Sequence, residues 1–319
     1  MTSPLGPQIE RFLRFKRGLG YRYGGEEHRL TVLDGFLTPR LDPEDPVITE
    51  DIVRAYVKGN GSDGRQRLTR IRQLCRFLSL EEPRTAVPPP RFLGTHRKPF
   101  IPRILTRDEG KAFLKACLCL PPGWCSPLSG TVHGTALALL YLTGMRKGEA
   151  LSLNLEDVDL SNGVIRIRQG KFGKSRLVPM AGDLTERMKE CRKFVDHALG
   201  KRHPAECFFP GPRGYRCTPS ALQRSFRRVL AHAGIPYLGP GKGPRLHDLR
   251  HSYTILRMIR WYEQGADLNA KLPVLSTCLG HVSLASSQHY IRLTKDLLNG
   301  VLGRYETRFG SLIQERRKG

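Results

Sequence analysis

Hydrophobic positions in the first part of the chain recur at the spacing of short helices. Three apolar stripes lie at residues 9–15, 30–37 and 52–57. A fourth stripe follows between residues 65 and 80. Because one helical face repeats about every 3.6 residues, these stripes predict helices with one buried side each. We therefore predict a helical domain over residues 1–82.

The fourth stretch has a basic face beside its apolar face. Arg65, Arg72 and Arg76 recur at helical spacing on the side that does not carry the apolar residues. The apolar side can pack inward while the basic side contacts phosphates. An ordinary solvated face would show the same pattern, so both interpretations stay open.

Residues 83–104 have the composition of a linker. Six prolines exclude a regular helix, and the segment holds five basic residues and no acid. A stiff basic strap of this kind can wrap around a duplex, with Arg97 and Lys98 as candidate DNA contacts. A simple spacer is the alternative.

The pattern changes again after residue 104. Thr106 and Glu109 have the spacing of a capping box, which predicts a helix to about residue 119. Residues 131–142 are apolar almost all round, which predicts a buried helix. The other predicted elements are strands at 164–168 and 176–180 and helices near 183–198, 219–233, 247–263 and 283–299.

These elements predict a mainly α-helical chain with a small β-sheet. The length of 319 residues suits a small domain followed by a medium one. The predicted organisation is a helical domain over 1–82, a basic linker over 83–104, and a second domain over 105–319.

The charge of the chain points to a polyanionic partner. Lys and Arg number 53 against 29 Asp and Glu, which gives a formal net charge of +24. Such an excess repels itself in a compact state unless a polyanion neutralises it, and duplex DNA is the first candidate. A ribosome-associated or membrane-surface protein would also be basic. No apolar run approaches the roughly 20 residues of a membrane span, so we expect a cytoplasmic protein.

The eight cysteines give no sign of a metal or redox site, since none forms a C-x-x-C pair. His203, Cys207 and Cys217 are a conceivable ligand set, but ordinary buried or surface thiols are the better explanation. We expect no metal and no cofactor.

Three clusters in the second domain carry the candidate chemistry. In the first, a buried helix ends at Gly144 and a new one begins near Arg146, where a guanidinium beside a helix N-terminus suits a phosphate. Glu149 lies one turn further on and can orient this arginine, or the two can form a plain surface ion pair.

The second cluster is a hairpin tip over residues 170–176 that holds Lys171 and Lys174. A lysine there can reach into a groove and deliver a proton, although a solubilising turn is the alternative. The third cluster starts with His247 and Arg250, which share one helical face, and continues with Leu-Gly-His281 and then Tyr290.

Together and in this order, the clusters resemble a known family. T-G-x-R-x-x-E, G-K-x-x-K-x-R, H-x-x-R-H and L-G-H followed nine residues later by Tyr are similar to the motifs of the tyrosine recombinases, the phage integrase family. The resemblance covers roughly residues 100–300. The helical front domain and its basic linker are similar to that family's DNA-clamping, core-binding domain.

The resemblance implies six active-site residues. Two arginines would bind the scissile phosphate, a lysine would protonate the leaving 5′ oxygen, and one histidine would act as acid or base. A second histidine would hold the phosphate, and a tyrosine would attack it to give a 3′-phosphotyrosine. In that order the residues are Arg146 and Arg250, Lys171 (or Lys174), His247, His281 and Tyr290.

The properties of the individual side chains also support a tyrosine nucleophile. A free tyrosine has a pKa of about 10 and is a poor nucleophile at neutral pH. Two guanidiniums and an imidazole would stabilise the developing charge. A phosphotyrosine conserves the energy of the broken ester, so rejoining needs no ATP, and the chain has no P-loop sequence.

The resemblance further implies double-stranded DNA as the partner and a tetramer on two DNA sites, with or without partner recombinases. It also implies a role in integration, excision or transposition of a mobile element. The alternatives are a non-cleaving accessory protein, a type IB topoisomerase and a helix-turn-helix regulator. The predicted helix 219–233 can read a major groove or contact only phosphates, through Arg224, Arg227 and Arg228.

Overall fold

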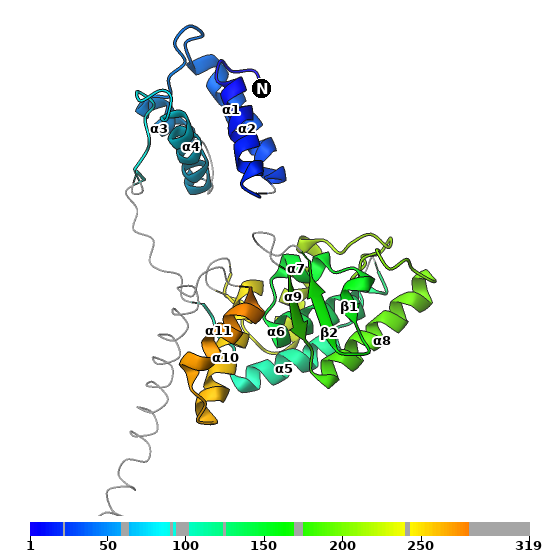
Figure 1. Cartoon of the computed structure of the whole chain (residues 1–319). Coiled ribbons are helices and arrows are strands. Elements are labelled where there is room, and N and C mark those ends of the chain that lie inside the picture. Colours follow the sequence, from blue (N-terminus) through cyan, green and yellow to red (C-terminus); the bar gives the residue numbers. More distant parts are fainter. Residues whose placement is uncertain are drawn as a thin grey trace, which may run out of the picture. The chain divides into compact units, whose positions relative to one another are not determined.

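The computed structural model describes residues 1–21, 23–58, 64–89, 92–93, 102–123, 126–168, 175–239 and 243–280. The chain divides into two compact units, Met1–Pro99 and Phe100–Gly319, which are described separately (Figure 1). The point of division lies in the proline-rich segment. The functional roles that the resemblance gives to the two parts stay predictions.

The first unit consists of four α-helices and one short 3-10 helix among its described residues. Most residues of the predicted apolar stripes lie in its core, but Phe15 of the first stripe is 49% exposed. The inward face of α4 is confirmed, since Leu68, Ile71 and Leu78 are at most 5% exposed. The elements are α1 Gly6–Gly18, α2 Gly24–Leu37, η1 Thr38–Arg40, α3 Glu50–Lys58 and α4 Gly64–Leu78.

The second unit is mainly helical with a small antiparallel sheet, in the order β1-β2-β3. This confirms the predicted fold class. Its elements are α5 Arg107–Leu118, α6 Ser129–Thr143, α7 Lys147–Ser152, η2 Leu155–Asp157, β1 Val158–Asp159, β2 Val164–Ile167, β3 Arg176–Pro179, α8 Gly182–Leu199, α9 Pro219–His232, α10 Leu246–Glu263 and α11 Leu268–Leu279.

Helix α6 is the centre of this unit. It packs against α5, α8, α9 and α10, and 12 of its 15 residues are buried, so the prediction of a buried helix is confirmed. Figure 1 shows α6 among the helices of the second unit, with α10 and α11 side by side at one end. Because α6 is held on all sides, the turn that follows it is a rigid place for a functional side chain.

Most predicted elements of the second unit are confirmed. The capping box is present, because the Thr106 side chain accepts from the Glu109 amide and the Glu109 side chain accepts from the Thr106 amide. Three elements were not predicted, the short 3-10 helix η2, the two-residue strand β1 and the helix α11. The predicted helix 283–299 lies outside the described residues. In the part of the chain that the structure describes, no helix is long and apolar enough to cross a bilayer.

Candidate active site

The first predicted cluster lies at the corner between α6 and α7. Helix α6 ends at Gly144, whose φ of 64° is left-handed, and Arg146 is the N-cap residue of α7. Glu149 accepts a hydrogen bond from the Arg146 backbone amide at 2.8 Å and another from Arg146 Nη1 at 2.8 Å. The corner therefore fixes both the backbone and the side chain of Arg146.

Gly144 is required at this corner for two reasons. Its positive φ is unfavourable for any residue with a Cβ, and a Cβ there would lie 2.4 Å from Tyr253 Cδ1 and 3.0 Å from Leu279 Cδ2. We expect Gly144→Ala to lower the free energy of unfolding of the second unit by about 2 kcal/mol. Both tryptophans of the chain, Trp124 and Trp261, belong to this unit, so their fluorescence in a urea titration measures its stability.

The matched control is Gly182→Ala at the start of α8. An added Cβ there meets no atom within 4 Å and its φ is not in the left-handed range, so we expect little change in stability. Equal urea midpoints for the two variants would contradict the assignment of strain to the corner.

Arg176 joins the strand β3 to this corner. Its Nη1 and Nη2 donate to the two carboxylate oxygens of Glu149 at 3.0 and 2.7 Å. Its Nε donates to the backbone carbonyl of Cys278 at 2.8 Å. The side chains of Arg176 and Glu149 are only 8% and 9% exposed, so this is a buried, two-pronged ion pair. Glu149 thus binds one arginine on each side.

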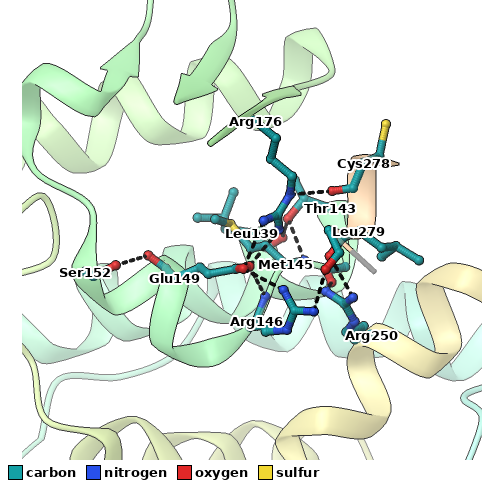
Figure 2. Close-up of polar contacts among 12 residues, drawn as sticks. Leu139, Thr143, Met145, Arg146, Glu149, Ser152, Arg176, Arg250, Cys278 and Leu279 are labelled. Atoms are coloured by element: carbon teal, nitrogen blue, oxygen red, sulfur yellow. Dashed lines mark hydrogen bonds and ion pairs between the residues drawn. The ribbon is translucent and has the colours of Figure 1, made fainter. Parts of the chain in front are cut away.

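The C-terminal end of α11 lies against three arginines. Arg176 donates to the Cys278 carbonyl, Arg250 Nη2 donates to the Leu279 carbonyl at 2.7 Å, and Arg146 Nη2 donates to the Gly280 carbonyl at 2.7 Å. Figure 2 shows these guanidiniums converging, with Glu149 on one side and the backbone of Cys278 and Leu279 on the other. The last carbonyls of a helix have no intrahelical partner and carry partial negative charge, which explains the attraction.

Arg250 is the most deeply placed of the three arginines. Its residue is 3% exposed, and its Nη1 also donates to the Gly144 carbonyl at 2.8 Å. It therefore ties α10 to both the corner after α6 and the end of α11. These two hydrogen bonds hold the Arg250 guanidinium, with its positive charge, in one position beside Arg146.

Two histidines of α10 lie next to the arginines. The rings of His247 and His251 are edge to face, with centroids 4.9 Å apart. The pKa of His247 is lowered, first by partial removal from water and then by the charge of Arg250 and Arg245. Burial, followed by the nearby His247, lowers the pKa of His251 to about 4. At neutral pH both imidazoles are therefore neutral, and a neutral ring has one nitrogen that can accept a proton.

The structure brings together half of the six predicted catalytic residues. Arg146, His247 and Arg250 lie around one centre, since both arginine charges act on His247. The remaining catalytic candidates and two candidate DNA contacts lie outside the described residues. These are Lys171 (with its alternative Lys174), His281, Tyr290, Arg97 and Lys98.

The other candidate DNA contacts have mixed surroundings. Arg65, Arg76, Arg224 and Arg227 are exposed. Arg72 donates to the backbone carbonyls of Pro88 and Pro89 at 2.8 and 2.6 Å, so its guanidinium is partly engaged by its own chain. The contacts of these side chains with DNA stay predictions.

Arg227 and Arg228 of α9 also contact their own chain. Arg227 lies over the Tyr237 ring at 5.0 Å. Arg228 donates to the Pro121 carbonyl at 2.8 Å.

Sequence reasoning did not single out Arg176 as a site residue. It appeared only as the last position of the hairpin motif, and its partner Glu149 lies on another element. An arginine at the start of a strand that returns toward the core is a weak signal for such a role.

The sequence profile of the phage integrase family matches residues 103–296. A putative integrase/recombinase, y4rE of Sinorhizobium fredii, is 33% identical over 298 residues, covering 92% of this chain and 93% of that protein. The tyrosine recombinase XerD of Vibrio cholerae is 30% identical over 233 residues, covering 72% of this chain and 70% of that protein.

Solved structures share the fold. The Tn1549 transposon integrase in complex with transposon right end DNA has a TM-score of 0.58 at 16% identity, covering 88% of this chain and 93% of that chain. A lambda integrase tetramer bound to a Holliday junction has a TM-score of 0.54 at 20% identity, covering 88% of this chain and 77% of that chain. At these identities the likeness is one of fold.

Proposed function

The chain belongs to the phage integrase family, and on this premise we propose that it cleaves and rejoins DNA strands through a covalent bond to Tyr290. It is a tyrosine-type DNA recombinase. The observation that carries the proposal is the convergence of Arg146, Arg250 and His247, from two different elements, on one small region of the surface. That region is built for a group with several anionic oxygens, which a phosphodiester is.

Arg146 can bind a phosphate in its present position. A guanidinium has five N–H donors. The side chain of Arg146 is 27% exposed, so the donors that do not bind Glu149 and Gly280 can reach a phosphate oxygen. Arg250 adds a fixed positive charge from its buried position. Such preset donors stabilise the extra negative charge of the transition state without having to reorganise.

The remaining steps fall to residues outside the described part of the chain. In this proposal Tyr290 attacks the phosphorus, and Lys171 protonates the 5′ oxygen that leaves. His281 holds a non-bridging oxygen by a hydrogen bond. The neutral His247 takes up or returns a proton as the tyrosine is bound and released. Rejoining reverses the same steps, because the new hydroxyl attacks the phosphotyrosine.

Double-stranded DNA is the proposed partner, and the proposed assembly is a tetramer on two DNA sites. The net charge of +24 supports the first. A lambda integrase of the same fold is a tetramer on a Holliday junction, which supports the second. The similarity over nearly the full length to an integrase/recombinase favours a mobile element as the setting.

The function is tested on a DNA duplex that carries the end sequence of the mobile element and a nick beside the cleavage position. The nick lets the cut fragment diffuse away, so the covalent intermediate accumulates. We expect a protein–DNA species that survives SDS and forms equally well in EDTA, since the proposed chemistry uses no metal. No adduct, or an adduct that EDTA abolishes, would contradict the proposal.

A supercoiled plasmid of unrelated sequence distinguishes the proposed recombinase from the main alternative, a type IB topoisomerase. A type IB topoisomerase would relax it, whereas a site-specific recombinase leaves it supercoiled.

A further inference from the structure

Arg176 has no role in the proposed chemistry, although it lies among the residues of the candidate site. It is the first residue of β3, and its side chain is 8% exposed. Its Nη1 and Nη2 donate to Glu149, and its Nε donates to the carbonyl of Cys278. Figure 2 shows the Arg176 side chain with these two partners. A buried guanidinium whose three nitrogens all have partners is unsuited to bind the phosphate itself.

The hydrogen bonds of Arg176 connect segments that are far apart in the chain. Glu149 lies 27 positions away on α7, and Cys278 lies 102 positions away on α11. Glu149 in turn accepts from the backbone amide and from Nη1 of Arg146, at 2.8 Å each. A displacement of Arg176 would therefore change both the orientation of Arg146 and the position of the end of α11.

Arg176 also supplies the main counter-charge of Glu149. Burial raises the pKa of Glu149, and the side-chain hydrogen bond from Arg176 is the largest of the effects that lower it, ahead of those of Arg146. Because Arg176 balances the charge of Glu149, this carboxylate can orient Arg146 without neutralising it. Without Arg176, Glu149 and Arg146 would be a neutral pair beside the phosphate, and the attraction of Arg146 for the phosphate would be weaker.

The glycine that ends α11 fits closely against the same arginine. A Cβ on Gly280 would lie 2.6 Å from Arg176 Nη1 and 2.9 Å from its Cζ. The carbonyl of Gly280 accepts from Arg146 Nη2 at 2.7 Å, so one residue of the backbone lies against two arginines. Gly280 directly precedes His281 in the sequence. The place from which the chain continues to the proposed phosphate ligand is therefore set next to Arg176.

We propose that Arg176 is a positioning residue for strand cleavage, which holds Arg146 and the end of α11 in place and leaves the charge of Arg146 available to the phosphate. The proposal rests on the proposed function, because cleavage is the reaction that the residue serves. It adds a third arginine to the site, one that acts through Glu149 and the backbone of α11 and does not touch the DNA.

The first test measures adduct formation on the nicked duplex with the full chain in excess, at a temperature where the variants are folded. Arg176→Met removes the charge and the hydrogen bonds of the side chain. We expect the rate constant at saturating protein to fall about 100-fold, the size of effect that a small misplacement of a catalytic group produces. The dissociation constant of an intact duplex should change by less than about threefold, since a positioning residue acts on the reaction and not on binding.

Arg202→Met is the matched control. Arg202 is also a buried arginine, with a side chain that is 4% exposed. It donates to the carboxylate of Asp196 at 2.8 Å and to the carbonyl of Cys207 at 2.9 Å, and neither partner belongs to the candidate site. We expect this variant to lose stability and to form the adduct at the wild-type rate. A rate in Arg176→Met no lower than in this control would overturn the proposal.

Arg176→Lys tests the geometry of the side chain and serves as the second variant if Arg176→Met does not fold. Lysine keeps the positive charge beside Glu149, but a single ammonium cannot reproduce the two-pronged contact together with the bond to Cys278. We expect a rate about tenfold below the wild type, roughly the effect of one lost hydrogen bond to a charged group. A wild-type rate in Arg176→Lys, should Arg176→Met not fold, would overturn the proposal.

The pH profile of the rate distinguishes positioning from a purely structural role. The charged groups that act on Glu149 are Arg146 on its own helix and Arg176 on β3. Without Arg176 the pKa of Glu149 rises, so the carboxylate is protonated at a higher pH and binds Arg146 less strongly. As the pH is lowered, the rate of Arg176→Met should therefore begin to fall at a higher pH than that of the wild type, whereas Arg176→Lys should follow the wild-type profile. A profile of Arg176→Met parallel to the wild type at every pH would mean that Arg176 supports only the fold, which contradicts the proposal.

The wild type is assayed in parallel, which separates the two proposals. No adduct with the wild type would reject the proposed function, and the role of Arg176 with it. A wild-type adduct together with an unaffected Arg176→Met variant would reject the role of Arg176 and leave the proposed function in place.

Discussion

Replacing Tyr290 with phenylalanine is expected to abolish the covalent protein–DNA species completely, while duplex binding stays at the wild-type level. The variant lacks only the phenol oxygen, which is the proposed nucleophile. It keeps the arginines and the charge that bind the phosphate. The variant therefore loses cleavage and keeps DNA binding, whereas a variant that failed to fold would lose both. The measurements are the SDS-resistant adduct on the nicked duplex and the dissociation constant of an intact one.

Tyr253→Phe is the matched control for this prediction. Tyr253 lies on α10 three residues after Arg250, and its ring borders the place where a Cβ on Gly144 would lie. It is thus a tyrosine that the structure puts close to the candidate site. We expect this variant to form the adduct as the wild type does. An adduct that persists in Tyr290→Phe and vanishes in Tyr253→Phe would move the nucleophile to α10.

The elements that sequence predicted well are those whose signals are local. The Thr106–Glu109 capping box depends on two side chains three residues apart, and it is present in the structure. The stretch around 131–142 is apolar on every side, and it became the buried helix α6. Arg146 was predicted at a corner because Gly144 ends one helix just before another begins, and both features are present.

Helix α11 shows where local signals were present and not used. Asp267 is its N-cap, Leu272, Leu275 and Leu279 are buried on one face, and Gly280 ends it with a φ of 64°. Pro273 lies inside the helix, after its first turn, and proline at such a position argues against a helix because it lacks an amide donor. The structure resolves the ambiguity through packing, because α11 buries its leucines against Ile255 and Met258 of α10.

The contacts among the site residues could not be predicted from spacing. Arg176 reaches Glu149 across 27 positions, and Arg250 reaches Gly144 across 106. These contacts form only when α7 and α10 pack against α6 and β3 packs against α11. Motif resemblance named Arg146, His247 and Arg250 because it carries information about such packing from other proteins. The resemblance says nothing of how the end of α11 binds Arg146, Arg176 and Arg250.

Replacing Glu149 with glutamine is expected to destabilise the second unit by about 3 kcal/mol at neutral pH. Glu149 accepts four hydrogen bonds, two from Arg146 and two from Arg176. Glutamine keeps the shape but removes the negative charge and turns one acceptor oxygen into a donor. Arg176, which is 8% exposed on its side chain, would then be a buried cation without its counter-charge. Tryptophan fluorescence in a urea titration measures the loss.

Glu263→Gln is the control, because it also removes one ion pair, here between Glu263 and Arg107. Those side chains are 49% and 60% exposed, and an exposed pair contributes less than about 1 kcal/mol. A loss in Glu149→Gln no larger than in this control would show that the buried pair does not hold the site together.

The pH dependence of the stability difference between the wild type and Glu149→Gln is an independent test of the same prediction. Burial opposes ionisation of Glu149, but the hydrogen bonds and charges of Arg176 and Arg146 outweigh it, so its pKa in the folded state is lowered. A lowered folded pKa contributes stability that is complete above the unfolded pKa of about 4.3 and is lost as the pH falls through the folded value. The advantage of the wild type over Glu149→Gln should therefore be constant near neutrality and shrink in acid. An advantage that grows as the pH falls would mean that the carboxyl is protonated in the folded site, and the arginines would then lack the anion that orients them.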